Sequence, residues 1–273
     1  MNAPRGRVLV IAGSDSGGGA GIQADIKTVT VLGGYAAPAV TAITVQNTLG
    51  VSGVSPIPVD VIEAQGRAVL DDIGADAIKT GMLGDVATVE AVVRLIDHAG
   101  AVPAVIDPVM IAKGGAALLP REAIHTIAEL LLPRAALLTP NAPEAATLTG
   151  LSVETTDDLR RAGEALLAKG AKAVLMKGGH VAGARVIDVL MTPDGEVTFE
   201  GERIETRHTH GTGCTLASAC ATGLARGLPV REAAHRAWSY VREAILRAPG
   251  LGAGHGPLDH GWPLRVRGPS SPA

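Results

Sequence analysis

The sequence predicts an α/β protein with a mostly parallel central sheet that is covered by helices on both faces. Short aliphatic and β-branched runs alternate with longer segments of helical periodicity, and no internal repeat or linker interrupts this order. The 273 residues, 47% of them hydrophobic, are enough to bury one large core. We therefore expect a single domain over residues 1–264, followed by a disordered tail at residues 265–273.

The alternation begins near the amino terminus. An apolar run at residues 8–12 predicts a strand, and the helical spacing of residues 22–29 predicts a helix that ends at Gly33. Further strands are expected at 37–44, 77–80, 104–107, 136–139 and 173–177. Helices are expected at 60–70, 85–98, 120–132, 143–149 and 156–169, and several of them open with Asp, Thr or Pro as a start signal. Strands that alternate with helices in this way form parallel sheets.

The pattern changes near the turn sequence Pro193-Asp194-Gly195. The runs at 186–190 and 196–200 flank this turn and predict an antiparallel hairpin at the sheet edge. Two final helices are expected at about 212–226 and 230–248. The uncharged stretch between Lys27 and Asp60 is broken repeatedly by Gly and Pro, so we expect two buried strands there and no membrane span.

Composition excludes several classes of function. The 24 Lys and Arg residues are balanced by 27 Asp and Glu, and two Trp, two Tyr and one Phe are the only stacking groups, so nucleic acid is not an expected partner.

Cys214 and Cys220 would lie roughly 9 Å apart on one helix, too far for a disulfide. The amino-terminal apolar run is too short for a secretory signal. We expect a cytoplasmic protein with neither a nucleic-acid nor a membrane partner.

Polar and glycine-rich segments follow six of the expected strands. They are residues 13–15, 46–47, 79–82, 107–110, 139–144 and 177–180. In parallel α/β sheets, ligands bind beyond the carboxyl ends of the strands. Because turn residues end strands in any protein, one such segment carries little weight. Six such segments, one after each of six expected strands, favour a binding site.

The glycine cluster at residues 17–21 follows the first strand and opens a helix. It lacks the spacing of a dinucleotide-binding fingerprint, and Gln46 stands where a ribose-binding acid would be expected. No phosphate-binding P-loop sequence occurs either. The small residues would let a flat ligand approach the backbone. Asp25, in the same helix, is either part of that site or a solvated carboxylate on the helix surface.

The segment 208–215 is the strongest candidate for an anion site. Its glycines precede a helix whose first N–H groups lack internal partners, so these groups can converge on a phosphate. Cys214 would lie at the positive end of the helix dipole, which favours the thiolate. A buried structural role is the alternative, and it suits Cys220 better. Zinc bound by His208, His210 and Cys214 is disfavoured because the usual ligand spacing is missing.

Seven segments together carry a resemblance to a known family: 11–16, 18–25, 46–48, 79–83, 139–145, 176–180 and 210–215. With them, and over about residues 8–260, the chain resembles the hydroxymethylpyrimidine and phosphomethylpyrimidine kinases of thiamine biosynthesis, within the ribokinase-like kinases. The resemblance implies a three-layer αβα fold with a mostly parallel sheet and a small antiparallel hairpin at its edge. It also implies transfer of the γ-phosphoryl group of ATP, with Mg²⁺, to an aminopyrimidine and then to its monophosphate. Related kinases are commonly dimers, so a homodimer is expected.

The resemblance also implies roles for particular residues. The pyrimidine pocket would consist of Gly13, Ala20, Asp25, Gln46, Met82 and Val109. Asn141, Lys177 and Thr212 would bind the nucleotide, Asp107 and Glu144 would hold the metal, and Gly211, Gly213 and Cys214 would form the anion hole and the catalytic group. Gln46 can offer a donor and an acceptor to an aminopyrimidine. Cys214 replaces the Asp of sugar kinases, which points away from sugars.

Two departures and three alternatives remain open. Ala253 stands where related sequences often have Lys, and residues 206–208 differ from the usual polar run, which leaves the nucleotide contacts open. A pyridoxine or pyridoxal kinase is the nearest alternative, although Gln46 and Met82 favour the aminopyrimidine. A pyrimidine-binding regulatory module without turnover is a second alternative. A dehydrogenase is the third, weakened by the missing ribose-binding acid.

Overall fold

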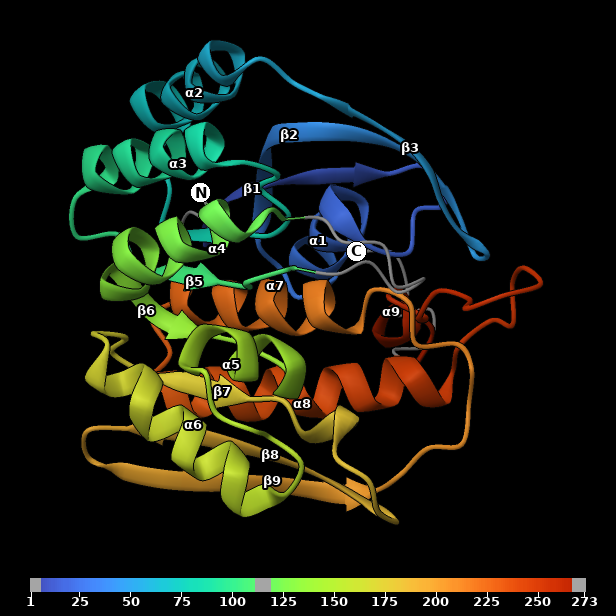
Figure 1. Ribbon diagram of the computed structural model, residues 1–273. Helices are drawn as coiled ribbons and strands as arrows, with labels where there is room; N and C mark the ends of the chain where they lie inside the picture. The colour runs from blue at the N-terminus through green and yellow to red at the C-terminus, as the bar shows by residue number, and fades with distance from the viewer. Residues whose placement is uncertain (1–5, 111–118, 267–273) are drawn as a thin grey trace.

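The computed structural model describes residues 6–110 and 119–266, and within them a nine-stranded sheet runs through the centre of the molecule (Figure 1). Its strands are β1 (Arg7–Asp15), β2 (Tyr35–Asn47), β3 (Gly50–Pro56), β4 (Ala77–Thr80), β5 (Ala104–Ile106), β6 (Ala135–Leu138), β7 (Val174–Met176), β8 (Arg185–Thr192) and β9 (Gly195–Glu202). They lie in the order β3-β2-β1-β4-β5-β6-β7-β8-β9. The pairs from β2 to β7 are parallel, and the pairs β2·β3, β7·β8 and β8·β9 are antiparallel.

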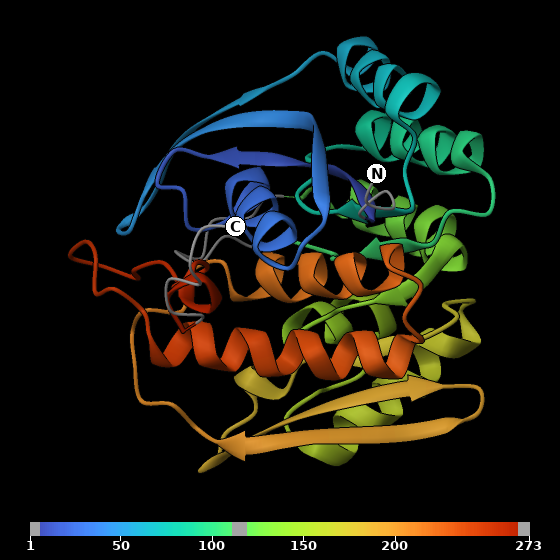
Figure 2. The same cartoon turned by 180° about the vertical axis from the view of Figure 1, so that it is seen from behind.

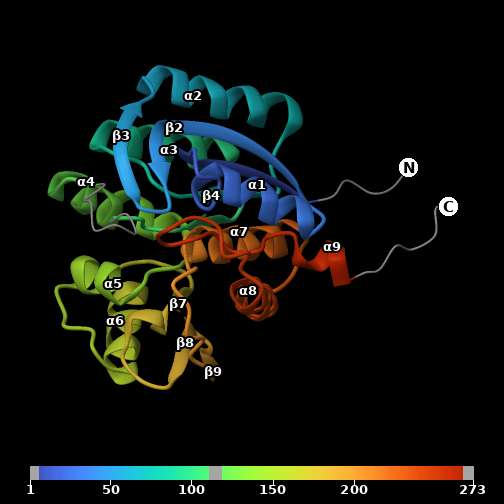
Figure 3. The same ribbon diagram turned by 90° about the vertical axis from the view of Figure 1, so that its right-hand side faces the viewer.

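Helices cover both faces of the sheet and complete three layers (Figures 2 and 3). They are α1 (Gly21–Val31), α2 (Val59–Ala68), α3 (Val86–Ala99), α4 (Arg121–Thr126), α5 (Ala142–Thr149), α6 (Thr156–Ala168), α7 (Thr212–Ala225), α8 (Val230–Leu246) and α9 (Trp262–Val266). One apolar core joins the sheet to side chains of α3–α6, and a second joins it to α1, α7 and α8. Fully buried residues such as Leu9 and Val10 alternate between the two cores because successive side chains of a strand point to opposite faces.

The predicted three-layer fold and the edge hairpin, β8 and β9, are confirmed. The uncharged stretch after Lys27 does contain two strands, β2 and β3, but only β2 has buried positions along its length. The prediction that both are buried was wrong for β3, which forms the other antiparallel edge and is mostly exposed. Within the described ranges, no helix is long and apolar enough to cross a membrane.

The chain ends differ slightly from expectation. Helix α9 includes residues 265 and 266, which we had assigned to the tail, and residues 267–273 of that predicted tail lie outside the described residues. Before α9, the segment 254–257 runs beside the cavity edge of the sheet. The backbone N–H of His255 donates to Thr48 at 2.8 Å, and the N–H of His210 donates to Gly256 at 3.1 Å. The carboxy-terminal segment therefore links the β2–β3 turn to the segment before α7.

Parallel strands place the six polar segments at one edge. The carboxyl ends of β1, β2, β4, β5, β6 and β7 all lie there because these strands run in the same direction. The amino terminus of α7 reaches the same edge, since Gly213 lies beside Asp107 and Lys177. The fold thus brings the predicted anion site to the predicted ligand edge.

Candidate active site

A cavity of about 820 Å³ lies along this edge of the sheet. It is lined by nearly all of the predicted site residues: Gly13, Ala20, Gln46, Met82, Asp107, Val109, Asn141, Glu144, Lys177, Gly211, Thr212, Gly213 and Cys214. Among the predicted residues, Asp25 alone is missing from the lining. One continuous cavity therefore joins the proposed pyrimidine residues to the proposed nucleotide residues.

Asp25 does not line the cavity, although it was predicted to be part of the pyrimidine pocket. Its side chain is fully buried, and Lys79 donates to its two oxygens at 2.8 and 2.9 Å. Ser218 on α7 adds a third bond at 2.6 Å. Burial raises the pKa of Asp25, while Lys79 and Ser218 oppose that shift. Asp25 is thus neither a solvated surface carboxylate nor a group that lines the pocket: its place is in a buried ion pair.

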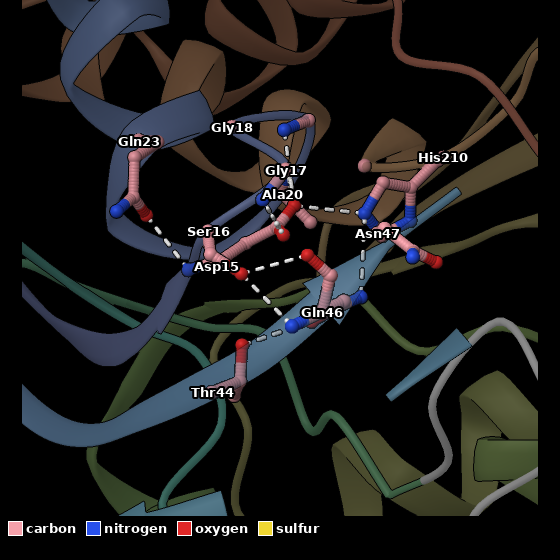
Figure 4. A network of polar contacts seen from close by, with 12 residues as sticks. Asp15, Ser16, Gly17, Gly18, Ala20, Gln23, Thr44, Gln46, Asn47 and His210 are labelled. Carbon is pink, nitrogen blue, oxygen red and sulfur yellow. Dashed lines mark hydrogen bonds and ion pairs between the residues drawn. The ribbon is translucent and has the colours of Figure 1, made fainter. Parts of the chain in front are cut away.

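The loop after β1 is organised by Asp15 (Figure 4). Its carboxylate accepts backbone N–H bonds from Gly17, Gly19 and Ala20 at 2.8–3.0 Å, and it lies 2.8 Å from Nε2 of His210. Burial favours the protonated acid, but the bonds from His210, Ala20 and Gly17 outweigh it and hold the pKa of Asp15 below its usual value. Asp15 is therefore a carboxylate that fixes the glycine loop and joins it to the segment before α7.

The predicted pyrimidine end of the cavity is built from β1, β2 and the loop after β4. Met82 covers the backbone of Gly13, where an added Cβ would lie 2.5 Å from the Met82 Cε atom. Gln46 is held at its backbone by Ser16, which donates to its carbonyl at 2.7 Å and accepts from its N–H at 2.8 Å. Its side-chain amide faces Thr44 and His210. These residues form a narrow slot with an amide at one side.

The amino terminus of α7 is shaped by Gly211. This residue has a φ of +85°, in the left-handed region, and an added Cβ would lie 1.8 Å from the carbonyl oxygen of Gly19. Gly213 and Cys214 follow in the first turn, where N–H groups have no acceptor within the helix. The helix dipole adds a partial positive charge. This turn can therefore bind a phosphate.

Charged groups lie beside that turn, on the side predicted to bind the nucleotide. Lys177 lies 3.0 Å from Asp107 Oδ1 and 3.8 Å from Glu144 Oε2. Burial opposes the charge on Lys177, but the two carboxylates outweigh it and raise its pKa. Asn141 caps α5 by accepting from the N–H of Glu144, whose carboxylate accepts from the N–H of Asn141. Burial raises the pKa of Glu144 to about 7, with Asp107 adding to the shift and Lys177 opposing it.

The same residues fit a magnesium ion. Among the described residues, Asp107 Oδ2 is a buried oxygen without a hydrogen-bond partner, and it points toward Gly213, whose added Cβ would lie 3.5 Å away. No group of three or more His, Cys, Asp or Glu side chains in the described chain could hold a metal by itself. Mg²⁺ commonly takes one or two carboxylates, with phosphates and water completing its shell. Asp107 and Glu144 supply such a pair.

Cys214 lines the cavity, and its burial disfavours the thiolate. Burial raises the pKa of its thiol to about 11, with Asp25 and Asp107 adding to the shift and Lys79 and a backbone bond from Gly21 opposing it. The expectation of a favoured thiolate was therefore wrong for this state: burial outweighs the helix terminus. Cys214 nevertheless lines the same cavity as Gln46 and Met82.

Several contributing residues escaped the sequence analysis. The cavity is also lined by Arg203, Ile204, Trp238 and Arg242. Arg203 also donates to three carbonyls of the loop after β7, those of Gly179, Val181 and Gly183. Only tertiary contacts place these side chains, because they come from the β9–α7 connection and from α8, where the sequence shows no motif. Lys79 was visible in a resemblance segment, but its buried pairing with Asp25 was not foreseeable.

Comparisons with known proteins agree with this geometry. A family model described as phosphomethylpyrimidine kinase matches residues 15–259. The hydroxymethylpyrimidine/phosphomethylpyrimidine kinase of Streptomyces coelicolor is 51% identical over 257 residues, which cover 94% of this chain and 95% of that one.

Two solved structures are similar over most of the chain. The phosphomethylpyrimidine kinase from Clostridium difficile 630 has a TM-score of 0.79 and 40% identity, and the match covers 88% of this chain and 99% of that one. The pyridoxal kinase from Staphylococcus aureus in complex with AMP-PCP and pyridoxal has a TM-score of 0.90 and 34% identity, with 97% and 96% coverage.

Proposed function

The chain belongs to the phosphomethylpyrimidine kinase family, and on that premise we propose that it is an ATP-dependent kinase of thiamine biosynthesis. It transfers the γ-phosphoryl group of ATP to 4-amino-5-hydroxymethyl-2-methylpyrimidine, called hydroxymethylpyrimidine below, and then a second phosphoryl group to the monophosphate. The observation that carries the proposal is the single cavity that joins the Gln46–Met82 slot to Lys177 and Glu144 past the amino terminus of α7.

The substrate ring lies in the slot. Gln46 offers an amide donor and acceptor to the amino group and the adjacent ring nitrogen. Met82 and Val109 supply apolar contact, and Gly13 and Ala20 leave room for the flat ring. The hydroxymethyl group then faces Cys214 and the first turn of α7.

Phosphoryl transfer requires positioning and neutralisation of charge more than covalent chemistry. The N–H groups of Gly211, Gly213 and Cys214 bind the transferring phosphoryl group, and Lys177 neutralises charge beside it. Asn141 and Thr212 contribute to the nucleotide side. Asp107 and Glu144 hold Mg²⁺, which supplies neutralisation of the phosphate oxygens when it is bound.

Cys214 accepts the hydroxymethyl proton in the first transfer. The second acceptor is a phosphate that is already anionic and needs no base. Because the resting thiol has a pKa of about 11, only its small thiolate fraction can serve in this role near neutral pH.

We further infer that two copies of the chain associate and that the protein acts in the cytoplasm, where ATP is supplied. The edge strand β3 supports association, because no other described strand pairs with its outer side. Val54 of β3 and Ile43 and Val45 of the neighbouring β2 are exposed. Light scattering at several protein concentrations tests the dimer. Residues 1–264 are proposed to act as one domain.

Product analysis tests the main proposal. Incubation with ATP, Mg²⁺ and hydroxymethylpyrimidine is expected to give first the monophosphate and then the diphosphate. Absence of both products would refute it. Ligand binding without release of ADP would instead favour the regulatory module, and titration with NAD tests the dehydrogenase.

A second candidate function is phosphorylation of pyridoxal. It is favoured by the similarity to the Staphylococcus aureus pyridoxal kinase structure with pyridoxal. Parallel assays with hydroxymethylpyrimidine and pyridoxal distinguish the two, and we expect the higher kcat/KM for hydroxymethylpyrimidine.

A further inference from the structure

The side-chain amide of Gln46 lies between two groups whose hydrogen-bonding roles are already determined. On one side is the hydroxyl of Thr44, 3.2 Å from Gln46 Oε1. On the other side is Nε2 of His210, 3.4 Å from Gln46 Nε2. Figure 4 shows this row of polar groups from β2 to the segment before α7.

Thr44 can offer Gln46 only a lone pair. Its single hydroxyl proton has a nearer acceptor, the carbonyl oxygen of Ser14 at 2.7 Å. A carbonyl oxygen cannot donate, so this bond uses the proton. The oxygen of Thr44 therefore needs a donor from Gln46.

The Nε2 atom of His210 offers Gln46 no lone pair. Its Nε2 lies 2.8 Å from the carboxylate of Asp15, which is ionised and can only accept. Nε2 of His210 must carry a proton to make that bond. That proton is directed to Asp15, and a ring nitrogen that bears a proton has no lone pair in the ring plane, so Nε2 cannot accept from the Gln46 N–H at 3.4 Å. The oxygen of Gln46 is therefore the better neighbour for this nitrogen.

A half-turn of the Gln46 amide satisfies both neighbours. The amide nitrogen then donates to Thr44, and the amide oxygen faces the protonated Nε2 of His210, in place of an acceptor facing an acceptor and a donor facing a donor. We infer that Thr44 and the Asp15–His210 pair hold the Gln46 amide in this orientation, and that they thereby select ligands with an amino group beside a ring nitrogen.

The ligand preference follows from the hydrogen-bonding groups of the Gln46 amide that remain unpaired. Once Thr44 and His210 are served, Gln46 presents one N–H and one oxygen lone pair to the cavity, in a fixed order. The N–H lies toward Thr44 and the oxygen toward His210. An amino group beside a ring nitrogen complements both, whereas a ring without the amino group leaves the Gln46 oxygen unpaired. Thr44, Asp15 and His210 are positioning residues for this recognition, which rests on the function proposed above.

Binding measurements test this role without depending on turnover. Titration calorimetry compares hydroxymethylpyrimidine with the same ring lacking its amino group, for the wild-type protein and four variants. Thr44→Val and His210→Leu remove the two groups that orient the amide. Thr44→Ser and His210→Gln keep a hydroxyl and a side-chain N–H as matched controls.

We expect the preference for the amino ring to fall about tenfold in Thr44→Val and in His210→Leu, the equivalent of one lost hydrogen bond of about 1.4 kcal/mol. The preference is expected to return in Thr44→Ser and His210→Gln. Thermal melting of each variant is measured in parallel. An unchanged preference in Thr44→Val and His210→Leu, with or without a lower melting temperature, overturns the inference and leaves only a structural role.

The proposed function fails separately. If the wild-type protein transfers no phosphoryl group from ATP to hydroxymethylpyrimidine, the kinase proposal is wrong whatever the binding ratios are. If it transfers the group and the binding preference does not respond to Thr44 or His210, only the present inference is wrong.

Discussion

The ammonium group of Lys79 lies 2.8 and 2.9 Å from the two carboxylate oxygens of Asp25, and neither side chain is exposed to solvent. Ser218, one helical turn beyond Cys214 on α7, completes the cluster. The three residues join β4, α1 and α7 directly below the proposed catalytic cysteine. Each of these buried charges depends on its counter-ion, because no water solvates it in the core and removal of one partner leaves the other charge unpaired.

Replacing one member of this pair is expected to be costly. Lys79→Met leaves the Asp25 carboxyl without its cation, and we expect a loss of about 3–5 kcal/mol in the free energy of unfolding, measured by urea denaturation. The double variant Lys79→Met/Asp25→Leu should recover much of that loss. Arg236→Met, which removes an exposed pair with Glu232, is the control and should cost about 1 kcal/mol or less. A similar small loss for Lys79→Met would contradict the prediction.

The first phosphoryl transfer should depend on pH through Cys214. Because its thiol pKa is raised to about 11, the thiolate fraction grows with each pH unit above neutrality, and kcat/KM for hydroxymethylpyrimidine should rise from pH 7 to 9. Cys214→Ala should remove this rise and slow the first transfer about 100-fold or more. Initial rates with the monophosphate as acceptor should change far less. Equal losses for the two acceptors would exclude Cys214 as the base.

Magnesium dependence should reveal the role of Glu144. In Glu144→Gln the side-chain oxygen can still accept from Asn141, so the cap of α5 is kept while the charge is lost. We expect the Mg²⁺ concentration for half-maximal rate to rise about 10- to 100-fold. Glu164→Gln, on the exposed side of α6, is the matched control. If both variants show the same Mg²⁺ dependence as the wild type, Glu144 does not hold the metal.

Space at the amino terminus of α7 should matter more for rate than for stability. In Gly213→Ala the new Cβ would lie 3.2 Å from Lys177 Nζ and 3.5 Å from Asp107 Oδ2, in the region assigned to the transferring phosphoryl group. We expect kcat to fall about 100-fold, the usual cost of a lost oxyanion contact, with a melting temperature close to that of the wild type. Gly261→Ala is the control: its new Cβ would lie 3.5 Å from the nearest atom, in Arg265, and Gly261 does not line the cavity. Its kcat should therefore equal that of the wild type. A kcat near the wild-type value in Gly213→Ala would refute the assignment.

The sequence predicted the central architecture because its signals are local. Buried strands such as β1 and β4 consist of aliphatic runs, and helices such as α5 carry their own start signals in Asn141 and Glu144. Strand β3 has no such signal: its residues include two glycines, two serines and a proline, and its pairing with β2 fixes it in place. It was expected to be buried because the stretch lacks charge, whereas it lies at an edge.

The site was predictable as far as its residues follow strand ends. Gln46, Met82, Lys177 and Cys214 meet in one cavity because parallel strands and α7 end at the same edge. Asp25 was misplaced because its partner Lys79 is 54 positions away, and no pattern in the helix reports an ion pair with another element. The thiol of Cys214 was misjudged for a similar reason, since the helix terminus is visible in the sequence but the burial around it is not.

The carboxy-terminal contacts have a consequence for synthesis of the protein. His255 and Gly256 bond to Thr48 and His210, and His210 in turn completes the surroundings of Asp15 and Gln46. A nascent chain on the ribosome cannot finish its substrate slot until these late residues have left the exit tunnel. Ligand capture must therefore wait for the synthesis of His255 and Gly256, long after β1 and its glycine loop have emerged.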